Sequence, residues 1–139
     1  MPARDFYHNI VMQALTQAGW EITDDPFILS YGGRDLYVDL GAEHDLLAAQ
    51  RDRQKIAVEI KSFLSQSPVY DLQSAIGQYD VYRSILEETE PNRMLYLAVP
   101  KRAYETIFSE KLGQLVIKRS SLQLMVFDEH SERIEAWIP

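Results

Sequence analysis

The chain contains no cysteine. Disulfide frameworks, thiolate zinc sites and cysteine nucleophiles are therefore excluded. Long apolar runs are missing as well, because no stretch approaches the roughly 18 residues that a membrane-spanning helix needs. The segment Met1–Asp5 lacks the charged-then-apolar pattern of a secretory signal. We therefore expect a cytoplasmic protein with no membrane partner.

An excess of positive charge is also absent, since 14 Lys and Arg stand against 21 Asp and Glu, for a formal net charge of −7. Proteins hold the phosphates of duplex DNA through Lys and Arg. The charge balance thus argues against a chain that binds DNA alone through a general basic surface. It leaves a metal-dependent nuclease open, because a metal site needs carboxylates and a partner protein could supply the basic surface.

The overall composition is ordinary for one globular domain. The 139 residues are 46% hydrophobic and 25% charged, which is enough apolar material for one core. No internal repeat, linker or low-complexity segment divides the sequence. We therefore predict a single domain over residues 1–139.

The spacing of apolar residues predicts alternating helices and strands. Amphipathic helices are expected at 5–18 and at 68–88, the second with Ser67 as N-cap and Pro68 in its first turn. A short helix is expected at 101–108. Strands are predicted at 27–31, 36–40, 56–61, 94–99, 114–118, 122–127 and 134–138, with a further short strand at 46–49. Since the long helix joins two potentially parallel strands, we predict an α/β fold with a mixed β-sheet flanked by α-helices.

The strand at 56–61, with the sequence IAVEIK, carries the most chemical information. Alternation along a strand places its aliphatic residues on one side and Glu59 and Lys61 on the other. Residues two apart on a strand lie roughly 7 Å from each other. Asp39 belongs to the strand predicted upstream. An Asp on one strand and Glu-x-Lys on a following strand is the arrangement of metal-dependent phosphodiesterases of the restriction-endonuclease type.

Phosphodiester hydrolysis needs a hard cation that binds phosphate oxygens and lowers the pKa of a bound water. Mg²⁺, or Mn²⁺ in its place, takes one or two carboxylates together with other oxygens. Asp39, Glu59 and the backbone carbonyl of Ile60 would supply such ligands. Lys61 would orient or deprotonate the attacking water, or stabilise the negative charge that develops.

Other interpretations of these acidic residues stay open. Glu59 and Lys61 could form a solvated strand face with an ion pair worth about 0–1 kcal/mol, although a helix that covers this face would make uncompensated charge costly. Glu43 and Asp45, which follow Gly41, are alternative acidic ligands. Asp39 is the first choice and Glu43 the next.

Two further polar residues are candidates for the site. His8 on the first helix could polarise a phosphate, although a single His on an amphipathic helix is also typical of a surface or boundary position. Gln78 on the long helix offers a donor and an acceptor beside the site. Its alternative is a polar residue at the edge of a packed helix. We include both among the candidate catalytic residues.

Blocks from end to end of the sequence resemble the XisH family, the fdxN-element excision controlling factors of cyanobacteria. The blocks are RDFYH at 4–8, DLYVDLGAE at 35–43, IAVEIKSF at 56–63, GQY at 77–79 and LYLAV at 95–99. The resemblance implies a restriction-endonuclease-like fold of the PD-(D/E)xK superfamily. It implies that Asp39, Glu59 and Lys61 occupy the positions of the catalytic pattern, with Val38 in place of the proline that names the pattern.

The resemblance further implies a role in site-specific DNA rearrangement, the excision of a prophage-like element during heterocyst differentiation. The implied partners are DNA, a site-specific recombinase and an XisI-like companion factor. Two functions then compete: a divalent-metal-dependent DNA endonuclease, and a non-catalytic accessory module that keeps the nuclease fold and binds a recombinase or partner factor. A homodimer is compatible with the first, because nucleases that cut both strands are often dimeric.

Overall fold

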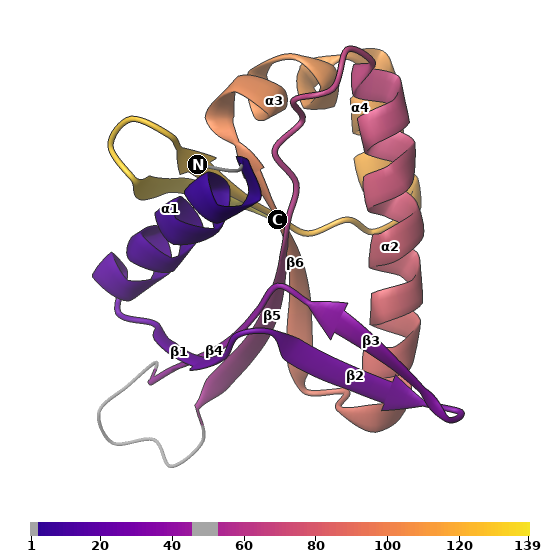
Figure 1. Cartoon of the computed structure of the whole chain (residues 1–139). Helices are drawn as coiled ribbons and strands as arrows, with labels where there is room; N and C mark the ends of the chain where they lie inside the picture. The colour runs from indigo at the N-terminus through magenta and orange to yellow at the C-terminus, as the bar shows by residue number, and fades with distance from the viewer. Residues whose placement is uncertain (1–2, 46–52) are drawn as a thin grey trace.

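The computed structural model describes residues 3–45 and 53–139 and has three layers, with a twisted sheet between helices on its two faces (Figure 1). The helical elements are α1 (Ala3–Gln17), α2 (Pro68–Thr89), α3 (Lys101–Glu105), the 3₁₀ turn η1 (Ile107–Ser109) and α4 (Lys111–Arg119). The strands are β1 (Glu21–Asp24), β2 (Phe27–Tyr31), β3 (Arg34–Val38), β4 (Leu40–His44), β5 (Gln54–Ile60), β6 (Arg93–Pro100), β7 (Leu124–Asp128) and β8 (Arg133–Ile138). The α/β fold class predicted from the sequence is confirmed.

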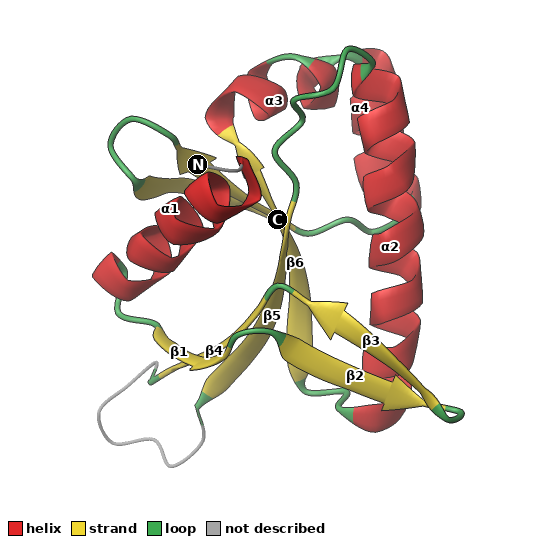
Figure 2. Ribbon diagram, in the orientation of Figure 1, coloured by secondary structure: helices red, strands yellow, loops and turns green. Residues whose placement is uncertain are grey.

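The main sheet is mixed and has six strands in the order β1-β4-β5-β6-β7-β8. β5, β6 and β7 are parallel, and the pairs at each side of them are antiparallel. α2 connects β5 to β6, and α3, η1 and α4 connect β6 to β7, as parallel neighbours require. β2 and β3 form a separate two-stranded hairpin beside α2 (Figure 2).

Two apolar clusters hold the layers together. On one face α1 packs on the sheet through a cluster that includes Val11, Leu15 and Val58. On the other face α2, η1 and the hairpin share a cluster that includes Ala57, Tyr79 and Phe108. β5 contributes to both clusters, so the charged residue that follows Ala57 on the same face, Glu59, lies under α2 and not in solvent.

α2 begins and ends where the sequence predicts. The side-chain oxygen of Ser67 accepts a hydrogen bond from the N–H of Tyr70 at 3.1 Å, and Pro68 occupies the first turn, where its missing N–H costs nothing. The buried stripe of the helix consists of Leu72, Ala75, Tyr79, Tyr82 and Leu86. These positions repeat every three or four residues, which keeps them on one face toward the sheet.

The strand predicted at 114–118 is wrong, because these residues form most of α4. The segment contains the β-branched pair Val116 and Ile117, which favours a strand when taken alone. Both residues pack on the cluster shared with α2, and with the buried Gly113 they follow the three- and four-residue spacing of a helix face. Tertiary packing thus outweighs their strand preference.

Two other features differ from the prediction, and one predicted strand is not tested. The strand expected at 36–40 is interrupted at Asp39, so that β3 ends at Val38 and β4 begins at Leu40. β1 was not predicted, because it has only four residues, which alternate between exposed and half-buried positions. The possible strand at 46–49 lies outside the described residues.

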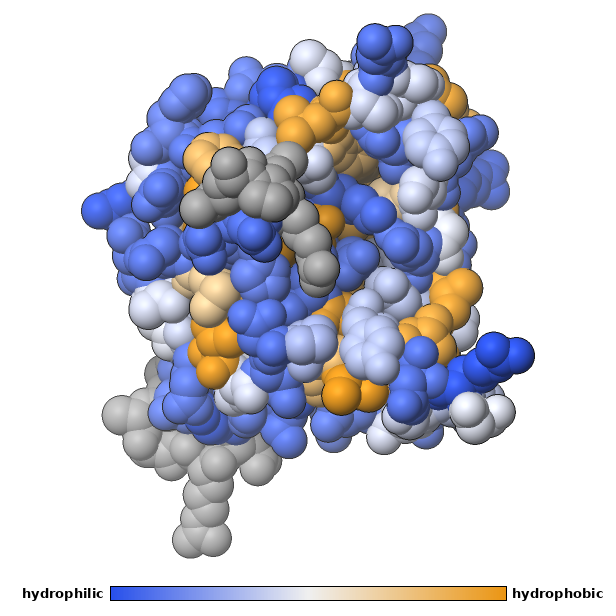
Figure 3. Space-filling view, viewed as in Figure 1, coloured by the Kyte–Doolittle hydropathy of each residue, from blue (hydrophilic) through white to orange (hydrophobic). Residues whose placement is uncertain are grey.

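The surface in the view of Figure 3 is mainly hydrophilic, with separate apolar patches. Among the helices of the described residues, none is both long and apolar enough to cross a membrane.

We predict opposite effects for alanine at two helical glycines. A Cβ at Gly113 would lie 2.1 Å from the carbonyl oxygen of Ile107, whereas a Cβ at Gly77 would meet no atom within 4 Å. Gly113→Ala should lower the free energy of unfolding by about 1–3 kcal/mol, because α4 and η1 must separate. Gly77→Ala should raise it by about 0.5–1 kcal/mol through helix propensity. Urea denaturation measures both, and equal effects would contradict the close approach at Gly113.

Candidate functional site

The carboxylates of Asp39 and Glu59 lie close together at the junction of β3 and β4. The bend at Asp39 ends the hairpin strand, and β4 then pairs with β5 so that Leu40 lies opposite Val58. The N–H of Asp39 donates to Glu59 Oε1 at 3.2 Å, and the N–H of Ile60 donates to Asp39 Oδ2 at 2.8 Å. Each carboxylate therefore accepts a backbone hydrogen bond from the other's segment, which holds both at one level of the sheet.

A pocket of about 320 Å³ opens at this point, at the carboxyl end of β5. Its lining residues are Tyr7, His8, Asp39, Glu59, Ile60, Lys61 and Ser62. Lys61 follows β5 directly, and its N–H donates to the carbonyl of Ala98 on β6 at 2.9 Å. The pocket thus brings together the three residues that the sequence singles out, Asp39, Glu59 and Lys61.

Glu59 is the most perturbed acid in this pocket. Its pKa rises from 4.5 to about 8, first because burial penalises the charged carboxylate, and next because the charge and the side chain of Asp39 face it. The N–H of Asp39 and the ammonium of Lys61 lower the pKa and offset part of this rise. Only 6% of Glu59 is exposed. A buried Glu59 beside the half-buried carboxylate of Asp39 favours either a bound proton or a bound cation.

The donor set fits a hard divalent cation. Residues 3–45 and 53–139 contain no group of three or more His, Cys, Asp or Glu side chains that could hold a metal ion. Mg²⁺ does not require such a group, because it is usually held by one or two carboxylates and keeps water or phosphate oxygens in its other positions. Asp39 and Glu59, with the nearby carbonyl of Ile60, match that pattern.

α2 closes the site from the other side. Burial, and next the charges of Glu59 and Asp39, raise the pKa of Tyr82 to about 12, which indicates that its hydroxyl lies near both carboxylates. Gln78 stands one turn earlier on the same helix, and its buried amide oxygen has no hydrogen-bond partner within the described ranges. A buried polar atom left in this state needs a partner. The sequence indicated Gln78 but not Tyr82, although their four-residue spacing was a signal for the pair.

His8 reaches the pocket from α1. Its Nε2 atom lies 2.9 Å from Oδ1 of Asp25, in the connection between β1 and β2. The imidazole is therefore oriented by a carboxylate while it lines the same pocket as Asp39. Asp25 was not identified from the sequence, because nothing in the local pattern relates it to a residue on the first helix.

Glu43 and Asp45, the alternative acidic ligands, do not reach this pocket. Glu43 pairs with Lys55 in the sheet and lines a second pocket with Arg53. Four residues along an extended strand separate it from Asp39 by roughly 13 Å. Asp45 is exposed, with its Oδ1 atom 3.0 Å from Nε of Arg53. Asp39 is therefore the acidic residue that faces Glu59, and the structure corrects the placement of Glu43 as a ligand.

Comparison with known proteins gives two kinds of match. A family model described as XisH protein matches residues 1–135. The crystal structure of an XisH family protein from Nostoc punctiforme PCC 73102 is 37% identical, covers 97% of this chain and 100% of its own, and superposes with a TM-score of 0.88. That of an fdxN element excision controlling factor protein from Anabaena variabilis is 41% identical, with 98% and 100% covered and a TM-score of 0.87. None of the curated proteins matches the chain.

Glu59→Gln should stabilise the protein more at about pH 8 than at about pH 5 when no divalent cation is present. Because the folded protein raises the pKa of Glu59 from 4.5 to about 8, unfolding releases a proton across that interval. The free energy of unfolding of the wild type therefore falls as the pH rises through it, by on the order of a few kcal/mol, and the glutamine variant lacks this loss. Urea denaturation at both pH values measures the difference.

The control for this prediction is Glu87→Gln on the exposed side of α2, where 71% of the side chain is accessible. This substitution should change the free energy of unfolding by the same small amount at both pH values. A Glu59→Gln effect that does not depend on pH would contradict the raised pKa.

Proposed function

The chain belongs to the XisH family, and from that premise we propose that it is a divalent-metal-dependent DNA endonuclease of the PD-(D/E)xK type. The reaction is hydrolysis of a phosphodiester bond. The observation that carries the proposal is the hydrogen-bonded pair of Asp39 and Glu59 in one pocket with Lys61. A buried Glu59 that faces a second, half-buried carboxylate is a costly arrangement for a fold to maintain unless the site binds a proton or a cation.

The residues of the pocket divide the work of hydrolysis. Asp39, Glu59 and the carbonyl of Ile60 would hold Mg²⁺ or Mn²⁺, which when bound neutralises phosphate charge and acidifies water. Lys61 orients the attacking water and stabilises the charge that develops on the phosphate. His8, held by Asp25, contacts a phosphate oxygen at the pocket wall.

Gln78 and Tyr82 complete the site from α2. The charges of Glu59 and Asp39 act on the hydroxyl of Tyr82, and Gln78, whose buried amide oxygen has no partner among the described residues, lies one helical turn earlier. Gln78 would satisfy its amide group through a water of the bound cation or of the substrate. Tyr82 stays protonated at neutral pH, since its pKa is raised to about 12, and is thus available as a hydrogen-bond donor.

The biological setting follows from family membership. We propose that this endonuclease acts in the excision of a DNA element of the fdxN type during heterocyst differentiation, in the cytoplasm, with a site-specific recombinase and an XisI-like companion factor. The related protein from Anabaena variabilis is described as an fdxN element excision controlling factor. A net charge of −7 favours such partners, because they can supply the basic surface that DNA binding requires. A homodimer would allow the cutting of both strands.

The activity is tested with purified protein, Mg²⁺ or Mn²⁺, and supercoiled, linear and single-stranded DNA. Lys61→Met should lower the cleavage rate by about 10²–10⁴-fold, because it removes the group that acts on the water. Lys55→Met is the matched control, since Lys55 is an exposed residue of β5, the strand that precedes Lys61, and lines the second pocket. Full activity of Lys61→Met would refute the role of Lys61, and chelation of the metal should abolish cleavage altogether.

Cation binding should depend on pH in a defined direction. Below about pH 8 a cation must displace the proton of Glu59, so the affinity for Mn²⁺ should rise roughly tenfold for each pH unit between about 5 and 8. Calorimetry at three pH values measures this slope together with the release of one proton. Glu59→Gln should remove the slope, and a slope that persists in this variant would contradict the assignment of Glu59 as the linked group.

A second function, the non-catalytic accessory module that binds a recombinase or partner factor, is favoured by the acidic net charge of −7. The two functions separate in a cell-based excision assay. If Lys61→Met and Glu59→Gln leave excision at the wild-type level while deletion of the protein abolishes it, the accessory function is correct. If both variants abolish excision and still bind the partner, the endonuclease is correct.

A further inference from the structure

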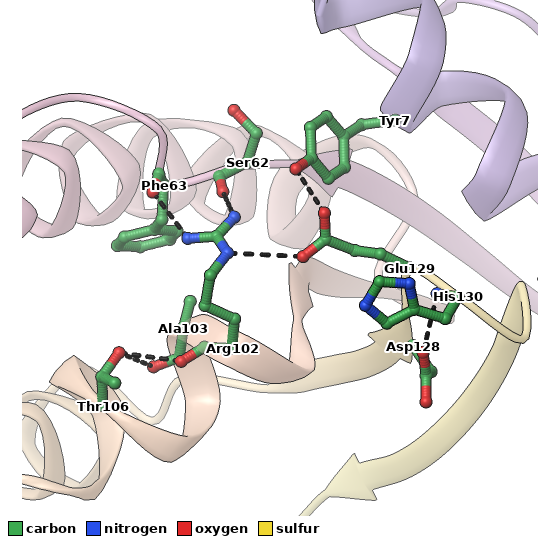
Figure 4. Close-up of polar contacts among 9 residues, drawn as sticks. All are labelled: Tyr7, Ser62, Phe63, Arg102, Ala103, Thr106, Asp128, Glu129 and His130. Atoms are coloured by element: carbon green, nitrogen blue, oxygen red, sulfur yellow. Dashed lines mark hydrogen bonds and ion pairs between the residues drawn. The ribbon is translucent and has the colours of Figure 1, made fainter.

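Arg102, the second residue of α3, contacts the turn that follows Lys61 (Figure 4). Its Nη2 donates to the carbonyl of Ser62 at 2.7 Å, and its Nη1 donates to the carbonyl of Phe63 at 2.9 Å. Its Nε donates to Glu129 Oε1 at 3.3 Å. Each guanidinium nitrogen thus has a protein partner, and two of the three hold consecutive carbonyls of one turn. Such charge-assisted bonds are stronger than neutral ones.

The turn itself has an unusual backbone. Phe63 has a φ of 55°, in the left-handed region that residues with a β-carbon rarely adopt. Its ring is buried and packs edge-to-face on Phe108, with the ring centroids 5.3 Å apart. A conformation of this kind persists only where its surroundings impose it. Here the surroundings are the ring contact on one side and Arg102 on the other.

Glu129 extends the contact to the pocket wall. Its Oε2 accepts a hydrogen bond from the hydroxyl of Tyr7 at 2.5 Å, and Tyr7 lines the pocket with Lys61 and Ser62. Figure 4 shows the path from Ser62 through Arg102 and Glu129 to Tyr7. The ion pair of Arg102 and Glu129 is partly exposed, with side-chain exposures of 44% and 22%, so it contributes little by itself. The geometric effect lies in the two carbonyl bonds.

Lys61 therefore lies between two fixed points. On its amino side the backbone N–H bonds to Ala98 of β6, and on its carboxyl side the next two carbonyls bond to Arg102. We infer that Arg102 is a positioning residue for Lys61: it fixes the turn at the end of β5 so that the Lys61 side chain enters the pocket beside Glu59. The effect of Arg102 on catalysis rests on the proposed endonuclease function. The hydrogen bonds by which Arg102 fixes Ser62 and Phe63 do not depend on that function.

The first test compares cleavage kinetics of Arg102→Ala, Arg102→Lys and a matched control, Arg83→Ala. Arg83 also donates to a backbone carbonyl, that of Ser120, and pairs with a carboxylate, that of Asp80, but it lies away from the pocket on α2. Arg102→Ala should lower kcat at least tenfold and change KM by less than threefold, because the substrate contacts remain and the water is misplaced. Arg102→Lys should recover part of the loss, and Arg83→Ala should stay within twofold of the wild type.

A double variant separates positioning from general destabilisation. If Arg102 acts through Lys61, adding Arg102→Ala to Lys61→Met should lower the residual kcat by less than twofold. A further loss as large as in the wild-type background would overturn the inference. Equal losses of kcat in Arg102→Ala and Arg83→Ala, at matched melting temperatures, would overturn it as well.

Backbone order parameters from NMR relaxation measure the rigidity of the turn without a DNA-cleavage assay. Residues 61–63 should have order parameters near those of rigid backbone in the wild type, and clearly lower ones in Arg102→Ala but not in Arg83→Ala. If the wild type cuts no DNA, or the residual activity of Lys61→Met is too small to measure, the order parameters of residues 61–63 alone test whether Arg102 fixes the turn. Unchanged order parameters at 61–63 overturn the inference, whereas failure of wild-type cleavage alone overturns only the proposed function.

Discussion

The mutual hydrogen bonding of Asp39 and Glu59 is the constraint on which the rest of the site depends. Each carboxylate accepts a backbone N–H from the segment that carries the other, at 3.2 and 2.8 Å. At Glu59 the backbone bond lowers the pKa, while burial and the proximity of Asp39 raise it. For Glu59 the opposing effects prevail and raise its pKa to about 8. The fold therefore holds in place a pair of groups that a proton or a cation must neutralise.

The position of this pair follows from the topology of the sheet. β5 lies inside the sheet with apolar clusters on both faces, so its carboxyl end can bury a charged side chain while Lys61 leaves toward the pocket. The bend at Asp39 passes the chain from the hairpin into the sheet beside this end. α2 covers one side and the start of α1 the other, through Tyr82 and His8. Burial of the charged groups at the site is unfavourable, and the apolar packing on the two faces of the sheet offsets it.

The sequence predicts what local periodicity determines. The two long helices, the strand at 93–100 and Glu59 on β5 are predicted from the sequence, because each depends on the spacing of residues within one element. α4 was missed because β-branched residues outweighed its helical spacing. Asp25, Tyr82 and Arg102 were not found as members of the site, because each joins it through a contact between segments far apart in the chain. For Asp25 and Arg102 no local pattern reports such a contact, whereas the four-residue spacing between Gln78 and Tyr82 was a local signal.

The negative charge of the chain and the proposed chemistry are connected at the pocket. A protein with a net charge of −7 repels a phosphate backbone. Without a cation the pocket has no net positive charge to oppose that repulsion, because Glu59 keeps its proton at neutral pH and the ammonium of Lys61 shares the pocket with Asp39. A divalent cation held by Asp39 and Glu59 would give the pocket a net positive charge, because its two charges would balance the two carboxylates and the ammonium of Lys61 would remain. Under the proposed function, DNA binding at the site is then conditional on cation binding there. DNA binding that does not depend on the cation must then come from a basic partner protein. An acidic chain of this kind would therefore cleave DNA as part of a complex.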